Sequence, residues 1–159
     1  MKQERTAIDK IREDTSEVVR YRREIAALAT LGLIDFSLIS LFQLGYIRKL
    51  PDVPGRVFDT QQVNSSKEAV LFGLPDGVVS LGAYTATIGL AAAATRFKRP
   101  SQVLDVAMGA VLLGQAAGAA QYLFNMAAVQ KKACIYCIAG AAINFAALKP
   151  LRRLLKRRD

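Results

Sequence analysis

The sequence predicts an all-α membrane protein, a bundle of four transmembrane helices with an outer loop and a short helix after the first span. Hydrophobic residues make up 52% of the 159 residues although the chain also carries 22 basic residues, so the apolar residues must be concentrated in segments. Four apolar stretches of about 16 to 27 residues follow one another, against the roughly 20 residues that a helix needs to cross the hydrocarbon core. These stretches are Ile25–Ile47, Ala69–Thr95, Val103–Val129 and Ala133–Leu148.

A soluble bundle of four helices is the alternative to this interpretation. Soluble helices keep a charged face toward water at helical spacing. The apolar stretches show no such face, and the formal charges within them or at their ends are Asp35, Glu68, Asp76 and Asp105. The hydropathy pattern therefore favours the membrane.

The distribution of basic residues predicts the orientation. Residues 1–24, the connection at 96–100 and the tail at 149–159 hold sixteen Lys or Arg residues, and the opposite side holds six. By the positive-inside rule both termini are cytoplasmic, and we expect an integral protein of a bacterial inner membrane. We divide the chain into an amphipathic stem (1–24), a four-helix domain (25–148) and a basic tail (149–159). The net charge of +9 follows from this topology and requires no nucleic acid partner.

The first two segments of the domain are a membrane span and an outer loop. Ile25–Ile47 is too long for the core of a signal peptide, so we interpret it as a retained span. Pro51, Pro54 and Gly55 predict a bent connection after it. Residues 59–69 are expected to form a short helix that caps the bundle.

The chain has two cysteines, Cys134 and Cys137, in a C-x-x-C pair at the start of the fourth apolar stretch. A structural zinc site needs about four ligands, and the chain contains no histidine. Covalent haem attachment needs a histidine after the second cysteine, where Ile138 stands. Redox chemistry needs only the two sulfurs, so the pair favours a redox-active dithiol over two inert buried cysteines.

The surroundings of the pair suit redox chemistry. A helix N-terminus and the preceding Lys131 and Lys132 favour negative charge, so one thiol should have a pKa below that of an ordinary cysteine. We expect Cys134 to be the more exposed thiol. Cys137 lies one turn deeper, where an electron carrier dissolved in the membrane reaches it.

Four local patterns in this order resemble the vitamin K epoxide reductase family over residues 25–148. They are the serine pair Ser65 and Ser66, the "FGLP" at 72–75, the "CIYCI" around the cysteine pair, and the "AIN" at 142–144. The resemblance implies a helical bundle that holds a quinone of the ubiquinone, menaquinone or phylloquinone type at its outer end, with no metal. The implied activity is that of a membrane thiol–quinone oxidoreductase.

The resemblance also implies roles for individual residues. Cys137 would face the quinone, and Cys134 would exchange disulfides with another thiol. Ser66 matches the loop serine of the family, and Asp76 falls where some members place an asparagine that hydrogen-bonds a quinone carbonyl. From its spacing alone, Asn144 lies on the same helix face as Cys137, two turns deeper, where it either packs between helices or contacts the quinone.

The sequence departs from the family in its outer loop. The loop cysteines of the family align with Pro51 or Asp52 and with Thr60, and none of these is a cysteine. A thioredoxin-like protein or another thiol would therefore have to reach Cys134 in trans. The alternative is a non-catalytic membrane scaffold, or a quinone-binding relative that has lost the dithiol relay.

The spans contain other polar residues, some with one expected role and others with two possible roles. Asp35 is expected to be hydrogen-bonded inside the bundle, and Gln121 and Asn125, four residues apart on one face, to bond between helices. Tyr84 and Tyr122 either anchor the bundle or line a pocket. Asp76 is either a solvated helix cap or a ligand contact.

Overall fold

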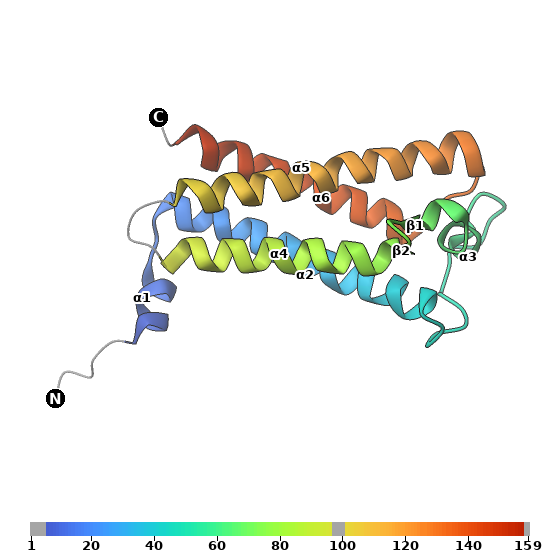
Figure 1. Cartoon of the computed structure of the whole chain (residues 1–159), viewed down its shortest axis with the longest axis horizontal. Helices are drawn as coiled ribbons and strands as arrows, with labels where there is room; N and C mark the ends of the chain where they lie inside the picture. Colours follow the sequence, from blue (N-terminus) through green and yellow to red (C-terminus); the bar gives the residue numbers. More distant parts are fainter. Residues whose placement is uncertain (1–5, 97–100, 158–159) are drawn as a thin grey trace.

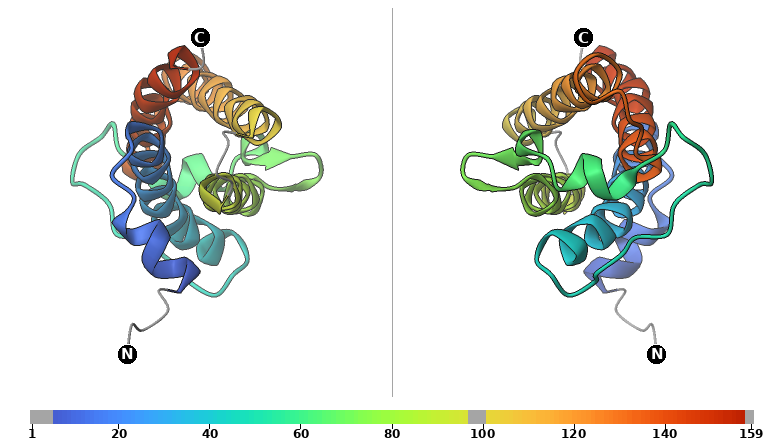
Figure 2. Two further views of the ribbon diagram at one scale, coloured as in Figure 1. Left: turned by 90° about the vertical axis from the view of Figure 1, so that its left-hand side faces the viewer. Right: turned by 90° about the vertical axis from the view of Figure 1, so that its right-hand side faces the viewer.

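Four long helices lie side by side and form the body of the protein (Figure 1). They are α2 (Glu17–Gln43), α4 (Asp76–Arg96), α5 (Gln102–Phe124) and α6 (Ile135–Lys156). The computed structural model describes residues 6–96 and 101–157, so most of the basic connection at 96–100 lies outside the described residues. Viewed along the bundle, the helices surround a common axis, and the segment after α2 crosses one end (Figure 2). Helix α1 and the C-terminal end of α6 lie at the other end.

Three of the four long helices are long and apolar enough to cross a membrane. They are α2, α4 and α5, the last continuing through the π-helix η2 (Asn125–Gln130). Large apolar side chains on their outer faces are exposed, as expected for contact with lipid; examples are Ile34, Val106 and Leu113. The apolar part of α6 is shorter, and Lys149 and Arg152 interrupt its second half, so the predicted fourth span remains a prediction.

The predicted stem is divided between two helices. α1 (Ala7–Glu13) is capped by Thr6, and the first long helix begins at Glu17, well before the expected span. Ser16 caps this helix, because its hydroxyl accepts a hydrogen bond from the backbone of Val19. The helix ends at Gln43, before Ile47, and Gly45 follows in a left-handed conformation (φ 83°).

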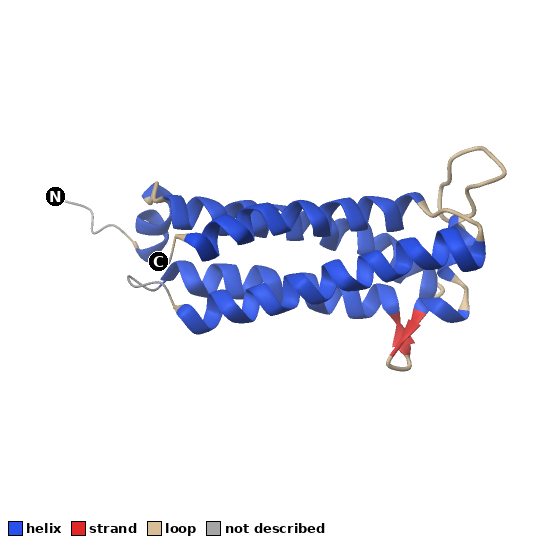
Figure 3. Cartoon of the chain, turned by 90° about the horizontal axis from the view of Figure 1, so that it is seen from above, coloured by secondary structure: helices blue, strands red, loops and turns tan. Residues whose placement is uncertain are grey.

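The outer end contains the expected short helix and a hairpin that the sequence did not predict. α3 (Thr60–Asn64) and η1 (Lys67–Ala69) are followed by strands β1 (Val70–Leu71) and β2 (Leu74–Pro75), which pair antiparallel. Phe72 and Gly73 both have positive φ at the turn. The hairpin projects from the side of the bundle (Figure 3), and α4 therefore begins at Asp76 rather than Ala69.

Two glycines allow the long helices to approach closely. α2 packs against α4 and α6, and α5 packs against the same two helices from the other side. A Cβ atom at Gly32 would lie 2.3 Å from the ring of Tyr84, and one at Gly140 would lie 2.5 Å from the ring of Phe36. These close contacts hold the rings of Tyr84 and Phe36 against one another, with 5.6 Å between their centroids.

A buried ion pair joins three helices near the termini. Arg22 of α2 lies 2.9 Å from the carboxylate of Asp105 in α5, and it also donates a 2.8 Å hydrogen bond to the carbonyl of Ala94 in α4. The side chains of Arg22 and Asp105 are 2% and 0% exposed. The sequence marks Asp105 as a charge within an apolar stretch, but it does not identify Arg22 as its partner.

Candidate active site

The cysteine pair lies at the outer end of the bundle, where α6 begins. Cys134 is the N-cap of α6, and its sulfur accepts a 3.1 Å hydrogen bond from the backbone N–H of Cys137. The two sulfurs are not joined in a disulfide. The C-x-x-C pair thus lies at the start of α6, with Cys134 buried and Cys137 partly buried.

The short helix α3 covers Cys134. The side-chain nitrogen of Asn64 donates a 3.2 Å hydrogen bond to the sulfur of Cys134. The side-chain oxygen of Asn64 accepts a hydrogen bond from the Cys137 thiol across 3.7 Å. Backbone hydrogen bonds of Ala133 to Val57 and Asp59 join the outer loop to the start of α6. Cys134 is consequently 0% exposed, whereas Cys137 is half-buried. The expectation that Cys134 is the more exposed thiol was wrong, because α3 and the loop at 57–59 pack directly over the start of α6.

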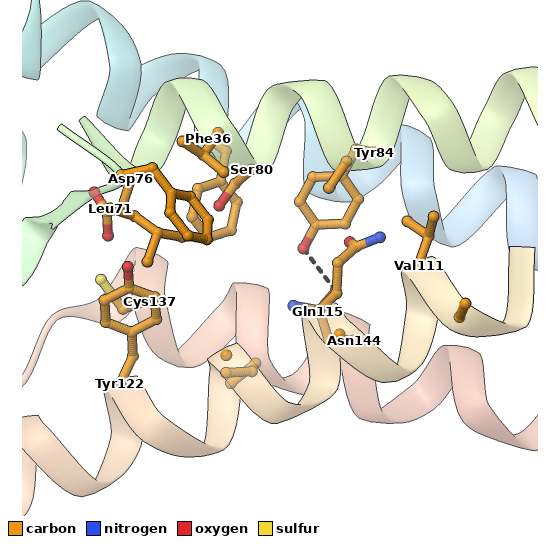
Figure 4. Close-up of a pocket in the computed structure, with 18 residues that line it drawn as sticks. Phe36, Leu71, Asp76, Ser80, Tyr84, Val111, Gln115, Tyr122, Cys137 and Asn144 are labelled. Carbon is orange, nitrogen blue, oxygen red and sulfur yellow. Dashed lines mark hydrogen bonds between the residues drawn. The ribbon is translucent and has the colours of Figure 1, made fainter. Parts of the chain in front are cut away.

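An apolar cavity of about 440 Å³ lies beside the cysteine pair, between α4, α5 and α6. Its walls include Val79, Ala119 and Ala141, and polar groups lie at its two ends (Figure 4). Those at the outer end are Asp76, Tyr122 and Cys137, and those at the inner end are Tyr84, Gln115 and Asn144. The sulfur of Cys137 thus faces a mostly apolar space with hydrogen-bonding groups at both ends.

Asp76 is held at the outer end of the cavity by Gln43. The amide nitrogen of Gln43 donates to the Asp76 carboxylate at 2.6 Å and to the backbone carbonyl of Asn64 at 3.2 Å. Its amide oxygen accepts from the backbone N–H of Gly77. Asp76 is buried and lines the cavity, so it is not a solvated helix cap. Gln43 therefore links α2, the start of α4 and the cap helix α3.

Asn144 lies at the inner end and is oriented by Tyr84. The Tyr84 hydroxyl donates a 2.9 Å hydrogen bond to the side-chain oxygen of Asn144. The side-chain nitrogen of Asn144 donates no hydrogen bond to another described residue. It is therefore available to a ligand in the cavity. Across the cavity, Gln115 donates to the hydroxyl of Thr87. Both Tyr84 and Tyr122 line the cavity, and Tyr84 also packs between helices against Phe36.

Ser66 does not line this cavity. Its hydroxyl donates to the carbonyl of Val63 and accepts a 2.9 Å hydrogen bond from Gln130 of η2. It borders a much smaller space that also touches Asp76 and Cys137. Its hydrogen bonds attach the outer loop to the end of the third span.

The two loop positions aligned with the family cysteines lie together. The Asp52 carboxylate accepts a 2.6 Å hydrogen bond from the backbone N–H of Thr60, which is fully buried. Desolvation slightly favours the neutral acid, but the hydrogen bonds from the Thr60 and Val53 backbones hold the pKa of the Asp52 carboxyl below its ordinary value. A polar pair thus stands at the two positions that the resemblance aligns with the family's loop cysteines.

Three further sequence interpretations need correction. Gln121 bonds to Asn125 within the same helix at 3.0 Å, rather than to a neighbouring helix. One carboxylate oxygen of Asp35 is buried and has no hydrogen-bond partner among residues 6–96 and 101–157. Lys132 donates to the carbonyl of Arg56, so its ammonium group is directed to the outer loop rather than to the thiols.

The residues that sequence reasoning missed are Gln43 and Asn64. Neither stands in a recognisable motif, and both reach the site through contacts between segments that are distant in sequence. Within the described part of the chain, no group of three or more His, Cys, Asp or Glu side chains is arranged to hold a metal ion.

Comparison with known families gives one match. The sequence profile of the vitamin K epoxide reductase family matches residues 23–149, which include most of α2, all of α4 and α5, the first part of α6 and both cysteines. A comparison with curated proteins finds no match.

Proposed function

The chain belongs to the vitamin K epoxide reductase family, and we propose that its dithiol, Cys134 and Cys137, exchanges electrons between a thiol partner and a membrane quinone. The family's thiol-dependent quinone chemistry and the three apolar helices make the protein an integral membrane oxidoreductase. The observation that carries the finer proposal is the position of Cys137. Its sulfur lines the apolar cavity, and Cys134 lies behind it under α3.

The proposed reaction balances with the two sulfurs alone. When the dithiol meets a quinone, the two thiols lose two electrons and two protons as the S–S bond forms, and the quinone takes them up as a hydroquinone. A partner dithiol then reduces the Cys134–Cys137 disulfide and itself becomes a disulfide. Each step is reversible, so the same residues serve either direction of electron flow.

The cavity residues suit a quinone ring. A quinone is planar and apolar with a carbonyl at each end, and the cavity is apolar with polar groups at each end. The amide nitrogen of Asn144 and the hydroxyl of Tyr122 are donors suited to carbonyl oxygens, and Asp76 donates only when protonated. We assign quinone contact to Asp76 and Asn144, and a supporting role to Ser66 through its bonds to Val63 and Gln130.

The partner and orientation belong to the same proposal. We infer a bacterial inner membrane, four spans and cytoplasmic termini. This is supported by the excess of basic residues near the termini and by the position of α1 and the C-terminal end of α6 at the same end of the bundle. The dithiol then faces the oxidising side. A thioredoxin-like partner must displace α3 to reach Cys134, because that sulfur is 0% exposed.

A second candidate is a quinone-binding relative without turnover. The observation that favours it is the pair of Asp52 and Thr60, which stands where family members have the loop dithiol. The burial of Cys134 also favours this second candidate, because an external thiol has no direct access to the Cys134 sulfur. The two candidates differ in whether quinone oxidises the dithiol.

The experiment that separates the candidates follows the free thiols. The reduced protein in detergent or membranes is treated with a menaquinone or ubiquinone analogue, and the remaining thiols are trapped with a mass tag over time. We expect both tags to be lost together, with hydroquinone formed in equal amount. Survival of both thiols at saturating quinone, with quinone still bound, would establish the non-catalytic relative instead.

Filling the cavity at Gly118 is expected to block quinone without affecting the dithiol. Gly118 lines the cavity, and a Cβ there meets no atom within 4 Å, so Gly118→Leu extends into the open space without a backbone clash. We expect the KM for the quinone analogue to rise about tenfold or more, since overpacking a filled site costs about 1–3 kcal/mol.

Gly82→Leu is the matched control for this substitution. Gly82 also has open space around it, but it lies on the exposed face of α4, outside the cavity. Its KM should equal that of the wild type. Equal KM values for both leucine variants would place the quinone elsewhere.

A further inference from the structure

The side chain of Asn64 contacts both sulfurs of the dithiol. Its amide nitrogen donates to the carbonyl of Thr60 at 2.8 Å and to the sulfur of Cys134 at 3.2 Å, which uses both N–H groups. Its oxygen accepts from the sulfur of Cys137. A single buried amide therefore presents a donor to one sulfur and an acceptor to the other.

The orientation of this amide is fixed by its third partner. A backbone carbonyl can only accept a hydrogen bond, so the nitrogen of Asn64 must face Thr60, and the same nitrogen faces Cys134. The oxygen is then left for Cys137. A thiolate only accepts hydrogen bonds, whereas a thiol donates one. The amide thus matches a thiolate at Cys134 and a protonated thiol at Cys137.

We propose that Asn64 is a positioning residue that sets the distribution of protons in the dithiol, holding Cys134 as the thiolate and Cys137 as the thiol. The proposal rests on the dithiol of the proposed function, but it concerns a property of the protein without quinone. It gives the cap helix α3 a chemical role in addition to covering the site.

Several contacts hold Asn64 in place and strengthen its effect. Gln43 donates to its backbone carbonyl at 3.2 Å, so Asn64 is attached to α2 as well as to α3. The backbone N–H of Cys137 supplies a second donor to the Cys134 sulfur. Because Cys134 is fully buried, water cannot replace a donor that is removed.

The titratable groups around the dithiol do not provide an alternative source of stabilisation. Asp35 of α2, Asp76 of α4, Tyr122 of α5 and Tyr136 of α6 act electrostatically on one or other cysteine. These four groups carry no positive charge at any pH, and an ionised carboxylate opposes a thiolate. The favourable interactions for a negative charge on Cys134 are therefore hydrogen bonds from the Cys137 thiol, from the backbone N–H of Cys137 and from the amide of Asn64.

Stabilising the thiolate also changes the redox balance. A dithiol whose reduced form is stabilised makes its disulfide a stronger oxidant. Loss of the Asn64 hydrogen bond is expected to reduce the thiolate fraction about tenfold at a fixed pH below its midpoint, since hydrogen bonds to charged groups are stronger than those between neutral groups. At a pH above both midpoints, the corresponding tenfold loss of stabilisation of the reduced form lowers the reduction potential by about 30 mV.

The test is a pH titration of the thiolate ultraviolet absorbance of the reduced full-length protein, in detergent and without quinone. Subtracting the titration curves of the Cys134→Ser and Cys137→Ser variants from that of the wild type assigns the absorbance change to one sulfur. We expect the low-pH step to disappear only in Cys134→Ser. In Asn64→Leu and in the nearly isosteric Asn64→Asp, its midpoint should rise by about one unit, and the reduction potential should fall. Gln62→Leu, an exposed position on the same helix, is the control with an unchanged midpoint.

Each result decides the proposal. A low-pH step that persists in Cys134→Ser and is lost in Cys137→Ser overturns the assignment, and this comparison leaves Asn64 intact. Equal midpoints in wild type and Asn64→Asp overturn the role of the amide. If quinone fails to oxidise the protein but the Asn64-dependent shift is found, the proposed function fails while this inference stands.

Discussion

Cys137→Ala is expected to lower quinone-driven oxidation of the protein by about 10³-fold or more, because it removes the sulfur that faces the cavity. Cys134 should then remain a free thiol at saturating quinone, since it is covered by α3 and does not line the cavity. The measurement is mass tagging of free thiols over time after addition of the quinone analogue.

The reciprocal variant shows which sulfur the quinone meets. Cys134→Ala keeps Cys137 at the cavity, so a small apolar alkylating reagent should modify Cys137, and bound quinone should protect it. Cys134 in the Cys137→Ala variant should react slowly with or without quinone. Oxidation of Cys134 at the wild-type rate in Cys137→Ala would show that quinone approaches the dithiol from the loop side, contrary to the proposed geometry.

The sequence predicts the helical bundle well because hydropathy acts over whole segments. α2, α4 and α5 fall on three of the predicted apolar stretches, and the short helix was expected at 59–69. The hairpin at 70–75 was missed because it consists of apolar residues that continue the second stretch without a polar boundary. The turn at Phe72 depends on a positive φ that propensity does not predict for phenylalanine.

Some residues of the site can be recognised from local sequence patterns, and others only from tertiary contacts. Cys134 and Cys137 are recognisable because their spacing is local, and Asp76 is recognisable because a carboxylate within an apolar stretch is costly. Asn64 and Gln43 are ordinary polar residues in the sequence. Only the packing of the outer loop against α6 and α2 brings Asn64 to the sulfurs and Gln43 to Asn64 and Asp76. The same packing buries Cys134, so its exposure was predicted incorrectly.

The ion pair of Arg22 and Asp105 is the second place where a large effect is expected. Its two side chains are almost completely buried, and Arg22 also bonds to the carbonyl of Ala94. Removing one partner leaves an uncompensated charge inside the bundle, which costs about 3–5 kcal/mol, whereas replacing both partners with apolar residues of similar size is often nearly neutral.

Arg22→Met should therefore lower the free energy of unfolding by about 3–5 kcal/mol, and Asp105→Leu by a similar amount. The double variant should recover most of this loss, because no unpaired charge remains. Unfolding of the detergent-solubilised protein by denaturant measures all three, with Arg20→Met, an exposed arginine on the same helix, as the control. Additive losses in the double variant would mean that the two side chains act independently. In that case the hydrogen bond from Arg22 to the carbonyl of Ala94, rather than the ion pair, would be the interaction that joins α2 to the end of α4.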